Sequence, residues 1–276
     1  DHFFVTANSY RIGNINFNDS LNFISSPGLQ NYCKTKGLWN GRKTFNFSLI
    51  FGGGRIEKSG SNRYNTLRMW RAMNLLSPGQ NISSELEYFP MFIKPDQRIS
   101  LEILFSILRD YYNNTPYDIW AEENLNKPDR SIADWNCVHS SVISLNPGQE
   151  ADYGSVIWTG LSTPYSAVYI PAYFGISTLP FEYKYAPEKA DINSAFWTFK
   201  ILGDSFRSNY PRDASEWIII RNNFEKHLIV KHKKVVKEAA YLFQKDPEDC
   251  RNYLNQQIHS FVQQAFKIVR LESKDE

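Results

Sequence analysis

The sequence predicts an α+β protein in which a sheet-forming part is followed by packed helices. Up to about residue 170 most segments are short. They are apolar or alternate between apolar and polar residues, and Gly, Pro, Asn and Ser bound them, a pattern typical of strands. Beyond residue 190 apolar residues recur at helical spacing over long stretches. A chain of 276 residues can bury a substantial core in one large domain, or at most two. Sheets followed by helices in this order indicate a layered architecture.

The first hundred residues predict two strands, of which Phe3–Ala7 is the first, and the first of two helical insertions. Residues 45–51 alternate strictly and end at Gly52-Gly53-Gly54, as expected of a strand that enters a turn. Ser61 to Leu76 reads as a helix that ends at Ser77-Pro78-Gly79. Ser100 is a good N-cap for the second helix, whose expected apolar stripe consists of Leu101, Leu104, Phe105 and Leu108.

The rest of the chain predicts one sheet and then three helices. The expected strands are His139–Leu145, Ser155–Leu161 and Ala167–Pro171. The expected helices are Asn193–Leu202, Ser215–Gln244 and Pro247–Leu271. Asp246-Pro247-Glu248-Asp249 is a helix start, because Asp suits the cap, Pro suits the first helical position and acids face the positive end of the helix dipole. We expect residues 1–190 to form the sheet-bearing core and residues 191–276 a helical region packed on it.

The composition argues against several classes of function. The 31 basic and 29 acidic residues give a net charge of +2, so nothing indicates a nucleic-acid partner. Apolar runs fall far short of the roughly 20 residues needed to span a bilayer, and no membrane association is expected. Cys33, Cys137 and Cys250 are widely spaced, which indicates neither a disulfide framework nor a structural metal site. The Asn-x-Ser/Thr sequons favour an extracytoplasmic location only slightly.

Cys137-Val138-His139, with Asp134 nearby, raises the alternative of a self-contained thiol mechanism. On a strand Cys137 and His139 point to the same face, but a spacing of two residues places them about 7 Å apart. That distance is too long for a direct hydrogen bond between nucleophile and base. A structural cysteine beside a half-buried histidine is the better interpretation. His139 still qualifies as a residue that lines a cleft.

Four stretches together resemble the dipeptidase family known as peptidase C69, a branch of the N-terminal-nucleophile hydrolases. The longest runs from Ser155 to Trp197, with two short strands and an aromatic, proline-punctuated loop before an Asn-Ser-Ala-Phe-Trp helix start. Residues 98–118 resemble the family's helix and its "RDxYxxTxYD" turn. The strand with His139-Ser140-Ser141-Val142 resembles its "HSSV" segment, and residues 3–12 resemble its "AN-x-x-RI" segment. The resemblance extends to about Phe206.

This resemblance implies part of a four-layer αββα fold and a cysteine-type amidohydrolase that needs no metal or organic cofactor. Enzymes of this kind attack a small peptide with the side chain of their first residue, and the first residue here is Asp1. The expected partner is therefore a preceding segment that carries the nucleophile, either as a separate chain after cleavage or as part of a longer chain. Asp1 would then mark a processing, cleavage or cloning boundary. Assembly into an oligomer is compatible with these features.

The resemblance also implies site residues. In the related acylase branch, an oxyanion Asn at a strand end precedes an Arg at a helix start by some fifty residues. Asn8, after the expected strand Phe3–Ala7, and Arg63 stand at a similar interval and match these roles. Arg11, Arg68 and Arg71 compete for the role of Arg63. His139, Trp158 and Tyr169 are the expected substrate-binding residues, since strand aromatics can wall a peptide pocket, although they more often belong to a core.

Two other functions remain open at this point. The chain could belong to an acylase that acts on N-acyl amides or N-acyl amino acids, because the Asn8 and Arg63 pattern fits that branch equally well. It could also belong to a non-catalytic relative that binds peptides or serves as a scaffold. A Cys, Ser or Thr at the mature start of the preceding segment would favour an enzyme.

Overall fold

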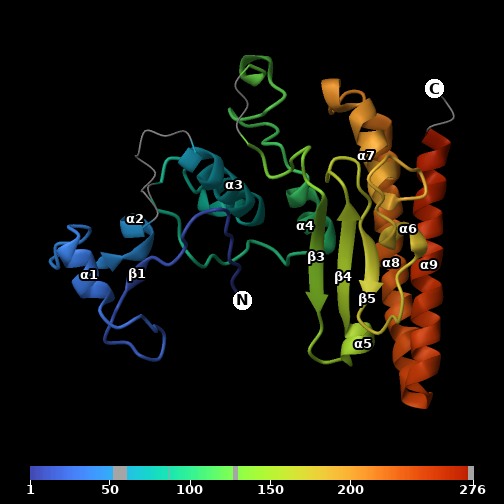
Figure 1. Cartoon of the computed structure of the whole chain (residues 1–276), viewed down its shortest axis with the longest axis horizontal. Coiled ribbons are helices and arrows are strands. Elements are labelled where there is room, and N and C mark those ends of the chain that lie inside the picture. The colour runs from blue at the N-terminus through green and yellow to red at the C-terminus, as the bar shows by residue number, and fades with distance from the viewer. Residues whose placement is uncertain (52–60, 87, 127–129, 273–276) are drawn as a thin grey trace. The chain divides into compact units, whose positions relative to one another are not determined.

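The computed structural model describes residues 1–51, 61–86, 88–126 and 130–272, and the side chains of these residues except for 61–64, 271 and 272. The chain forms two compact units (Figure 1). Unit 1 consists of residues 1–99, 114–119 and 126–131, and unit 2 consists of residues 100–113, 120–125 and 132–276. The expected boundary near residue 190 falls inside unit 2, and the assignment of residues 1–190 and 191–276 stays a prediction.

Unit 1 contains short elements and one longer helix. Its described elements are β1 (Asn14–Ile15), α1 (Leu29–Thr35), β2 (Phe45–Asn46), α2 (Phe47–Phe51), α3 (Ser61–Leu76) and the 3₁₀ helix η1 (Pro78–Gln80). The expected helix 61–76 is confirmed as α3, and it ends at Leu76, directly before the Ser77-Pro78-Gly79 sequence that predicts its end. Met69 and Met73 of α3 are buried against Ile82, Phe89 and Ile93 and form the small core of this unit.

The expected strand 45–51 is wrong beyond its first two residues. Phe45 and Asn46 pair antiparallel with β1, and the chain then turns into α2. The Asn46 side chain accepts a hydrogen bond from the Leu49 N–H at 3.0 Å and donates to the Asn14 side chain at 2.9 Å. Asparagine at this position acts as a helix N-cap, which outweighs the alternating pattern. The glycines expected to form the turn, residues 52–54, lie outside the described residues.

Unit 2 is a three-stranded antiparallel sheet with helices on one face. Its elements are α4 (Leu101–Leu108), η2 (Glu122–Asn124), β3 (His139–Leu145), α5 (Ala151–Gly154), β4 (Ser155–Leu161), β5 (Ile170–Tyr173), α6 (Phe181–Lys184), α7 (Ala195–Ser205), η3 (Arg207–Asn209), α8 (Ser215–Lys245) and α9 (Pro247–Glu272). The strand order is β3-β4-β5. Figure 1 shows α8 and α9 side by side next to β5, and both helices contact that strand.

Most expectations for unit 2 are confirmed. Strands β3 and β4 have the predicted bounds, and α8 and α9 end within one residue of the predicted ends. The Ser100 side chain caps α4 by accepting from the Ile103 N–H at 3.3 Å. Asp246 caps α9 by accepting from the Glu248 N–H at 2.9 Å. The third strand begins at Ile170 instead of Ala167, because residues 164–167 form a buried turn whose carbonyl groups bind side chains.

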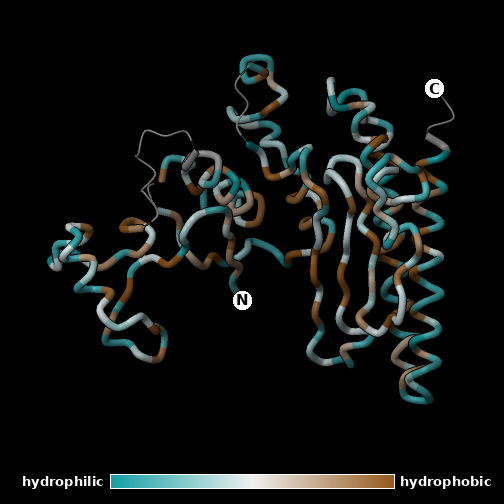
Figure 2. The backbone as a smooth tube through the Cα atoms, in the orientation of Figure 1, coloured by the Kyte–Doolittle hydropathy of each residue, from teal (hydrophilic) through white to brown (hydrophobic). Residues whose placement is uncertain are grey.

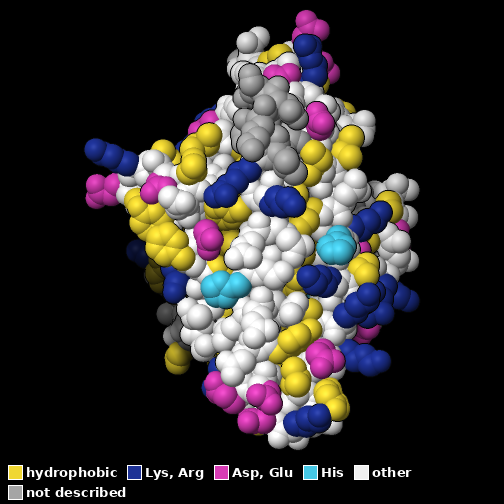
Figure 3. Space-filling model, turned by 90° about the vertical axis from the view of Figure 1, so that its right-hand side faces the viewer, with side chains coloured by type: hydrophobic (Ala, Val, Ile, Leu, Met, Phe, Trp, Pro, Cys, Tyr) yellow, Lys and Arg dark blue, Asp and Glu magenta, His cyan; other side chains and the backbone are white. Residues whose placement is uncertain are grey.

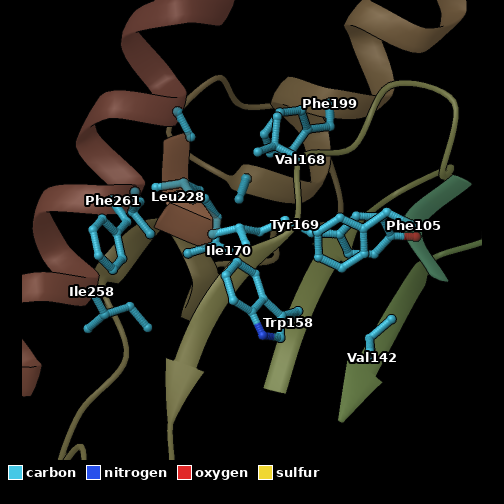
Figure 4. Packing of buried hydrophobic residues seen from close by; sticks show 14 of the residues in the cluster. Phe105, Val142, Trp158, Val168, Tyr169, Ile170, Phe199, Leu228, Ile258 and Phe261 are labelled. Carbon is cyan, nitrogen blue, oxygen red and sulfur yellow. The ribbon is translucent and has the colours of Figure 1, made fainter. Parts of the chain in front are cut away.

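The sheet register separates a covered face from an open face. Val142 lies opposite Trp158, and Val156 lies opposite Tyr173, so these residues share one face. That face is buried beneath α4 and α8 (Figure 4), where Phe105, Leu228 and Phe199 complete the core. The other face carries apolar side chains that remain exposed, with exposed fractions of 64% for Ile143, 69% for Leu145, 37% for Ile157 and 70% for Phe174.

The two long helices present apolar positions to the core and polar positions outward, so hydropathy alternates along α8 and α9 (Figure 2). On the face shown in Figure 3, cationic and acidic side chains are interspersed with apolar ones. The basic stretch 231–237 is spread around α8: Lys231 lies over the Phe261 ring at 5.0 Å, whereas Lys233, Lys234 and Lys237 are exposed. This distribution fits a solvated helix.

His232 lies half-buried on the covered face and should make the free energy of unfolding depend on pH. Its ring stacks on Tyr173, its Nδ1 atom lies 3.1 Å from the Tyr173 hydroxyl, and Trp158 meets it edge-on. Burial, with a smaller effect of Lys233, lowers the pKa of His232 to about 4. The unfolded histidine has a pKa of about 6.5. The unfolded state therefore takes up a proton first as the pH falls, and the stability present above pH 6.5 is lost towards pH 4.

We expect the wild-type chain to lose about 2 kcal/mol more of its free energy of unfolding between pH 7.5 and pH 5 than the His232→Gln variant. Urea unfolding curves at the two pH values measure this difference. The exposed His259 on α9 provides the matched control, and His259→Gln should behave like the wild type. Equal pH dependence of wild type and His232→Gln would contradict the assignment.

Candidate functional site

Asn8 and Arg63 both belong to unit 1. A hydrogen bond connects the backbone of Asn8 to α3, the helix that contains Arg63. The expected strand 3–7 is absent within the described part of the chain, apart from an isolated bridge between Phe3 and Ile93. Asn8 is exposed in a bend, and its backbone oxygen accepts a hydrogen bond from the Asn65 side chain at 2.8 Å. Arg63 lies in the first turn of α3, two residues before Asn65, but its side chain is outside the described residues. Their catalytic roles stay predictions.

One of the arginines that compete with Arg63 is committed to the fold of unit 1. Arg11 is 7% exposed and donates to the backbone oxygens of Val5, Phe89 and Pro90 at 2.9, 3.3 and 2.6 Å. Burial lowers the pKa of Arg11. Arg68 donates to the Asn65 side chain, which in turn holds the Asn8 carbonyl. Asn65 is not recognisable as a site residue from the sequence, because an asparagine inside a helix carries no distinctive pattern.

The sheet separates His139 from the other two expected substrate-binding residues. His139 begins β3 and is exposed, on the face that also carries Ile143. Trp158 lies opposite Val142 and therefore points to the covered face. Trp158 and Tyr169 are completely buried, and the Trp158 Nε1 atom has no hydrogen-bond partner within the part of the chain that is described. The structure thus brings Trp158 and Tyr169 together but not His139, and the substrate-binding role of all three stays a prediction.

Tyr169 connects the covered face to the strand that bears His139. Its hydroxyl lies 2.7 Å from the Ser140 hydroxyl, next to His139. Its ring stacks on Phe105 with a centroid distance of 4.3 Å, as Figure 4 shows, and the Arg109 guanidinium lies 4.6 Å from the ring centroid. Burial raises the pKa of the Tyr169 hydroxyl. Tyr169 is therefore a neutral hydrogen-bonding group at neutral pH.

The alternative of a Cys137 and His139 pair gains no support from the turn before β3. The Cys137 N–H donates to the backbone oxygen of Asp134 at 3.2 Å. The Asp134 carboxylate accepts from the Asn136 N–H at 2.8 Å. These bonds describe an Asx turn, in which the carboxylate shapes the backbone.

A buried ion pair holds the loop that leads into β5. Arg109, at the end of α4, forms a bidentate pair with Glu225 of α8 through contacts of 2.7 and 2.6 Å. Glu225 also accepts from the Tyr169 N–H at 2.8 Å. Arg109 donates further to the backbone oxygens of Pro164 and Ala167 at 3.0 and 2.9 Å. Every polar atom of the pair is thus hydrogen-bonded in the interior, as a buried charge requires.

Two more side chains of α8 bind the same loop. Arg221 donates to the Tyr165 backbone oxygen at 2.6 Å, and the Trp217 indole donates to the Ser166 backbone oxygen at 3.1 Å. Four consecutive carbonyl groups, those of residues 164–167, therefore accept bonds from side chains of α4 and α8. We refer to these contacts, together with Glu225, as the loop clamp.

The loop clamp has an excess of positive charge, since it contains two arginines and one carboxylate. Burial, followed by repulsion from Arg109, lowers the pKa of Arg221 to about 10. Burial alone would lower the pKa of Arg109, but Glu225 raises it above its ordinary value. The sequence itself carries a signal for these buried charges. Arg221 and Glu225 stand at helical spacing between Trp217 and Leu228, on the apolar face of α8, where unpaired charges are not tolerated.

Within the described residues no cluster of His, Cys, Asp and Glu side chains could hold a metal ion. None of the helices in this part of the chain is long and apolar enough to cross a membrane.

Sequence comparison relates the chain to peptidases. It is 29% identical to a probable dipeptidase of Salmonella dublin over 178 residues, which cover 64% of this chain and 40% of that protein. It is 27% identical to a probable dipeptidase of Latilactobacillus sakei, over 76% of this chain and 44% of the relative. A probable dipeptidase B of Lactococcus lactis is 25% identical over 97% of this chain and 56% of the relative.

The model of peptidase family C69 matches residues 1–221, so the chain belongs to this family. The expected resemblance is confirmed. The chain spans about half the length of the curated relatives that it matches. The matched region contains Arg109 and the loop 164–169, whereas Glu225 lies beyond its end.

Proposed function

We propose that this chain is part of a cysteine-type amidohydrolase that cleaves dipeptides. Membership of peptidase family C69, together with relatives that are probable dipeptidases, carries the proposal. These relatives favour dipeptides over N-acyl amides as substrates.

The proposed mechanism follows from the N-terminal-nucleophile class. A terminal Cys thiolate, supplied by a segment that precedes this chain, attacks the peptide carbonyl carbon, and its own α-amino group carries the proton to the leaving amine. The Asn8 side-chain amide donates to the oxyanion of the tetrahedral intermediate. Water then attacks the thioester and releases the acyl group. Arg63 is the proposed partner for a negatively charged group, and His139 is the residue of the proposed peptide-binding set that is exposed.

The four-layer αββα fold is likewise a proposal. Unit 2 has one sheet whose covered face meets helices and whose open face displays Ile143, Leu145, Ile157 and Phe174. An apolar sheet face normally packs against a second layer. The relatives are about twice as long as the region that they share with this chain, which leaves enough residues for a second sheet.

A substrate panel tests the function. The full-length protein should hydrolyse dipeptides and leave N-acyl amino acids largely intact, as measured by release of free amine. Replacement of the N-terminal Cys of the mature enzyme by Ala should abolish turnover. Preferential hydrolysis of N-acyl amino acids would favour the acylase alternative, and a full-length protein that binds dipeptides without cleaving them would indicate a non-catalytic relative.

The open face gives a prediction that distinguishes this chain from the longer protein. In the isolated chain, Ile143→Thr with Leu145→Thr should reduce binding of an apolar fluorescent dye and change the free energy of unfolding by less than about 0.5 kcal/mol, because both side chains are solvated. In the full-length protein the same two substitutions should lower the free energy of unfolding by about 2–4 kcal/mol. If a second layer buries Ile143 and Leu145, replacing them by Thr loses the free energy gained by removing each apolar side chain from water.

Ile219 on α8 is 62% exposed and provides the control, since Ile219→Thr should have a small effect in both proteins. An equally small effect of the Ile143 and Leu145 pair in the full-length protein would show that no second layer covers this face.

A further inference from the structure

Unit 2 contains a cavity of about 230 Å³ between α7 and α9. The wall from α7 consists of residues at helical spacing, so one stripe of the helix faces the cavity. The wall from α9 is a second stripe, and the buried residues Trp217 and Phe206 also line the cavity. The lining residues on the helices are Thr198, Ile201, Leu202 and Ser205 of α7 and Phe266, Val269 and Arg270 of α9.

The size of the cavity restricts its ligand. A cavity of about 150 Å³ lined by apolar residues accommodates benzene, and drug-sized ligands occupy about 300–1,000 Å³. A volume between these limits fits one aromatic ring or one branched aliphatic chain with a small polar group. Ile192 and Ile201 at the rim are 64% and 47% exposed, which favours an apolar body that continues to the opening.

The polar atoms of the α7 wall are placed to accept hydrogen bonds. The Thr198 hydroxyl donates to the Ile192 backbone oxygen at 2.8 Å, and the Ser205 hydroxyl donates to the Leu202 backbone oxygen at 2.7 Å. Both hydroxyl hydrogens are therefore used, and the oxygens retain lone pairs. The Trp217 indole N–H is already used, since it donates to the Ser166 backbone oxygen. A ligand that donates hydrogen bonds suits this wall.

Asp213 adds a negative charge to the lining. Its Oδ1 atom accepts from the Asn209 side chain at 2.8 Å and lies 3.9 Å from the Arg212 Nε atom. Its Oδ2 atom accepts no hydrogen bond in the part of the chain that the structure describes. A carboxylate oxygen that accepts no other bond is matched by an ammonium group, which offers three donors and a positive charge. Arg270 contributes a positive charge to the lining from α9.

We propose that this cavity binds an apolar α-amino acid, with the branched or aromatic side chain between α7 and α9 and the ammonium group at Asp213. The amino-acid class rests on the proposed function, because cleavage of a dipeptide releases amino acids. The cavity would thus respond to product that accumulates during turnover.

Calorimetric titration of the full-length protein with leucine tests the proposal. Leucine has no peptide bond, so its binding is measured without turnover and is independent of the dipeptidase assay. Isopentylamine should also bind, whereas 4-methylpentanoate, which lacks the ammonium group, should bind at least about tenfold more weakly than leucine. Asp213→Asn retains the bond to Asn209 but loses the charge, and should weaken leucine binding about tenfold or more.

Two further variants make the result specific to the cavity. Ile201→Trp places a large side chain at the rim and should abolish leucine binding. Asp204→Asn is the matched control on α7, because Asp204 pairs with Lys200 and does not line the cavity; it should leave leucine affinity unchanged. Absence of leucine binding, binding of 4-methylpentanoate as tight as that of leucine, or full leucine affinity in Asp213→Asn would overturn the proposal. Loss of dipeptide hydrolysis without loss of leucine binding would count against the proposed function alone.

Discussion

Replacement of Glu225 by Ala should lower the free energy of unfolding by about 3–5 kcal/mol, because it leaves Arg109 as an uncompensated charge in the core. Glu225 accepts both bonds of the bidentate pair and the Tyr169 N–H, so its removal also deprives a buried backbone donor of its partner. Urea unfolding monitored by tryptophan fluorescence measures the change. Arg221 lies in the same cluster, and its own charge would add to the imbalance.

Glu238→Ala is the control on the same helix, since Glu238 is exposed and its replacement should change stability by less than about 0.5 kcal/mol. The double variant Arg109→Met with Glu225→Leu removes both charges and should be less destabilised than Glu225→Ala alone. It should not recover fully, because the carbonyl groups of Pro164 and Ala167 lose their donors. A double variant that is as unstable as the sum of its single variants would show that the two charges are not coupled.

On the proposed mechanism, Asn8→Ala in the full-length protein should reduce kcat about 10²–10³-fold, which corresponds to roughly 2.7–4 kcal/mol of transition-state stabilisation. KM should change little, because in the proposed role the amide binds the oxyanion more strongly than the ground-state carbonyl. Steady-state kinetics with a dipeptide measure both constants. The substitution should leave the local backbone unchanged. Asn65 binds the backbone oxygen of Asn8, and that bond does not depend on the Asn8 side chain.

Asn8→Asp makes the test sharper, because it keeps the shape but places a carboxylate next to the developing negative charge. It should be at least as damaging as Asn8→Ala. Asn8 is exposed, so both variants should retain nearly the stability of the wild type. Near-normal kcat in both folded variants would show that Asn8 is only a turn residue.

Sequence patterns predicted the regular part of unit 2 well. Strands β3 and β4 combine β-branched and aromatic residues with clear turns, and α8 and α9 have long periodic patterns and a strong start at Asp246. These signals are local. Strand 45–51 failed because the Asn46 side chain forms a cap, and a polar side chain that competes with the backbone leaves the alternating pattern unchanged.

The candidate site was less accessible to prediction, because its contacts join distant parts of the sequence. The bond between Asn65 and Asn8 spans 57 residues, and the pair between Arg109 and Glu225 spans 116. The roles of Asn8 and Arg63 came from resemblance. To predict that His139 and Trp158 point to opposite faces of the sheet, one needs the register of β3 against β4. A shift of one residue in that register would place both side chains on the same face.

The loop clamp also has a consequence for the order of events during synthesis. Arg109 and the loop 164–169 leave the ribosome well before Glu225, Arg221 and Trp217 of α8. Until α8 emerges, Arg109 lacks its acid, and the Tyr169 N–H lacks its acceptor. The contacts that hold β5 therefore form late. Their rate of formation depends on bringing together α4 and α8, which are separated by a long segment of chain. Nascent chains that stop at residue 221 should remain sensitive to protease near Tyr169, and chains that extend past α9 should become resistant.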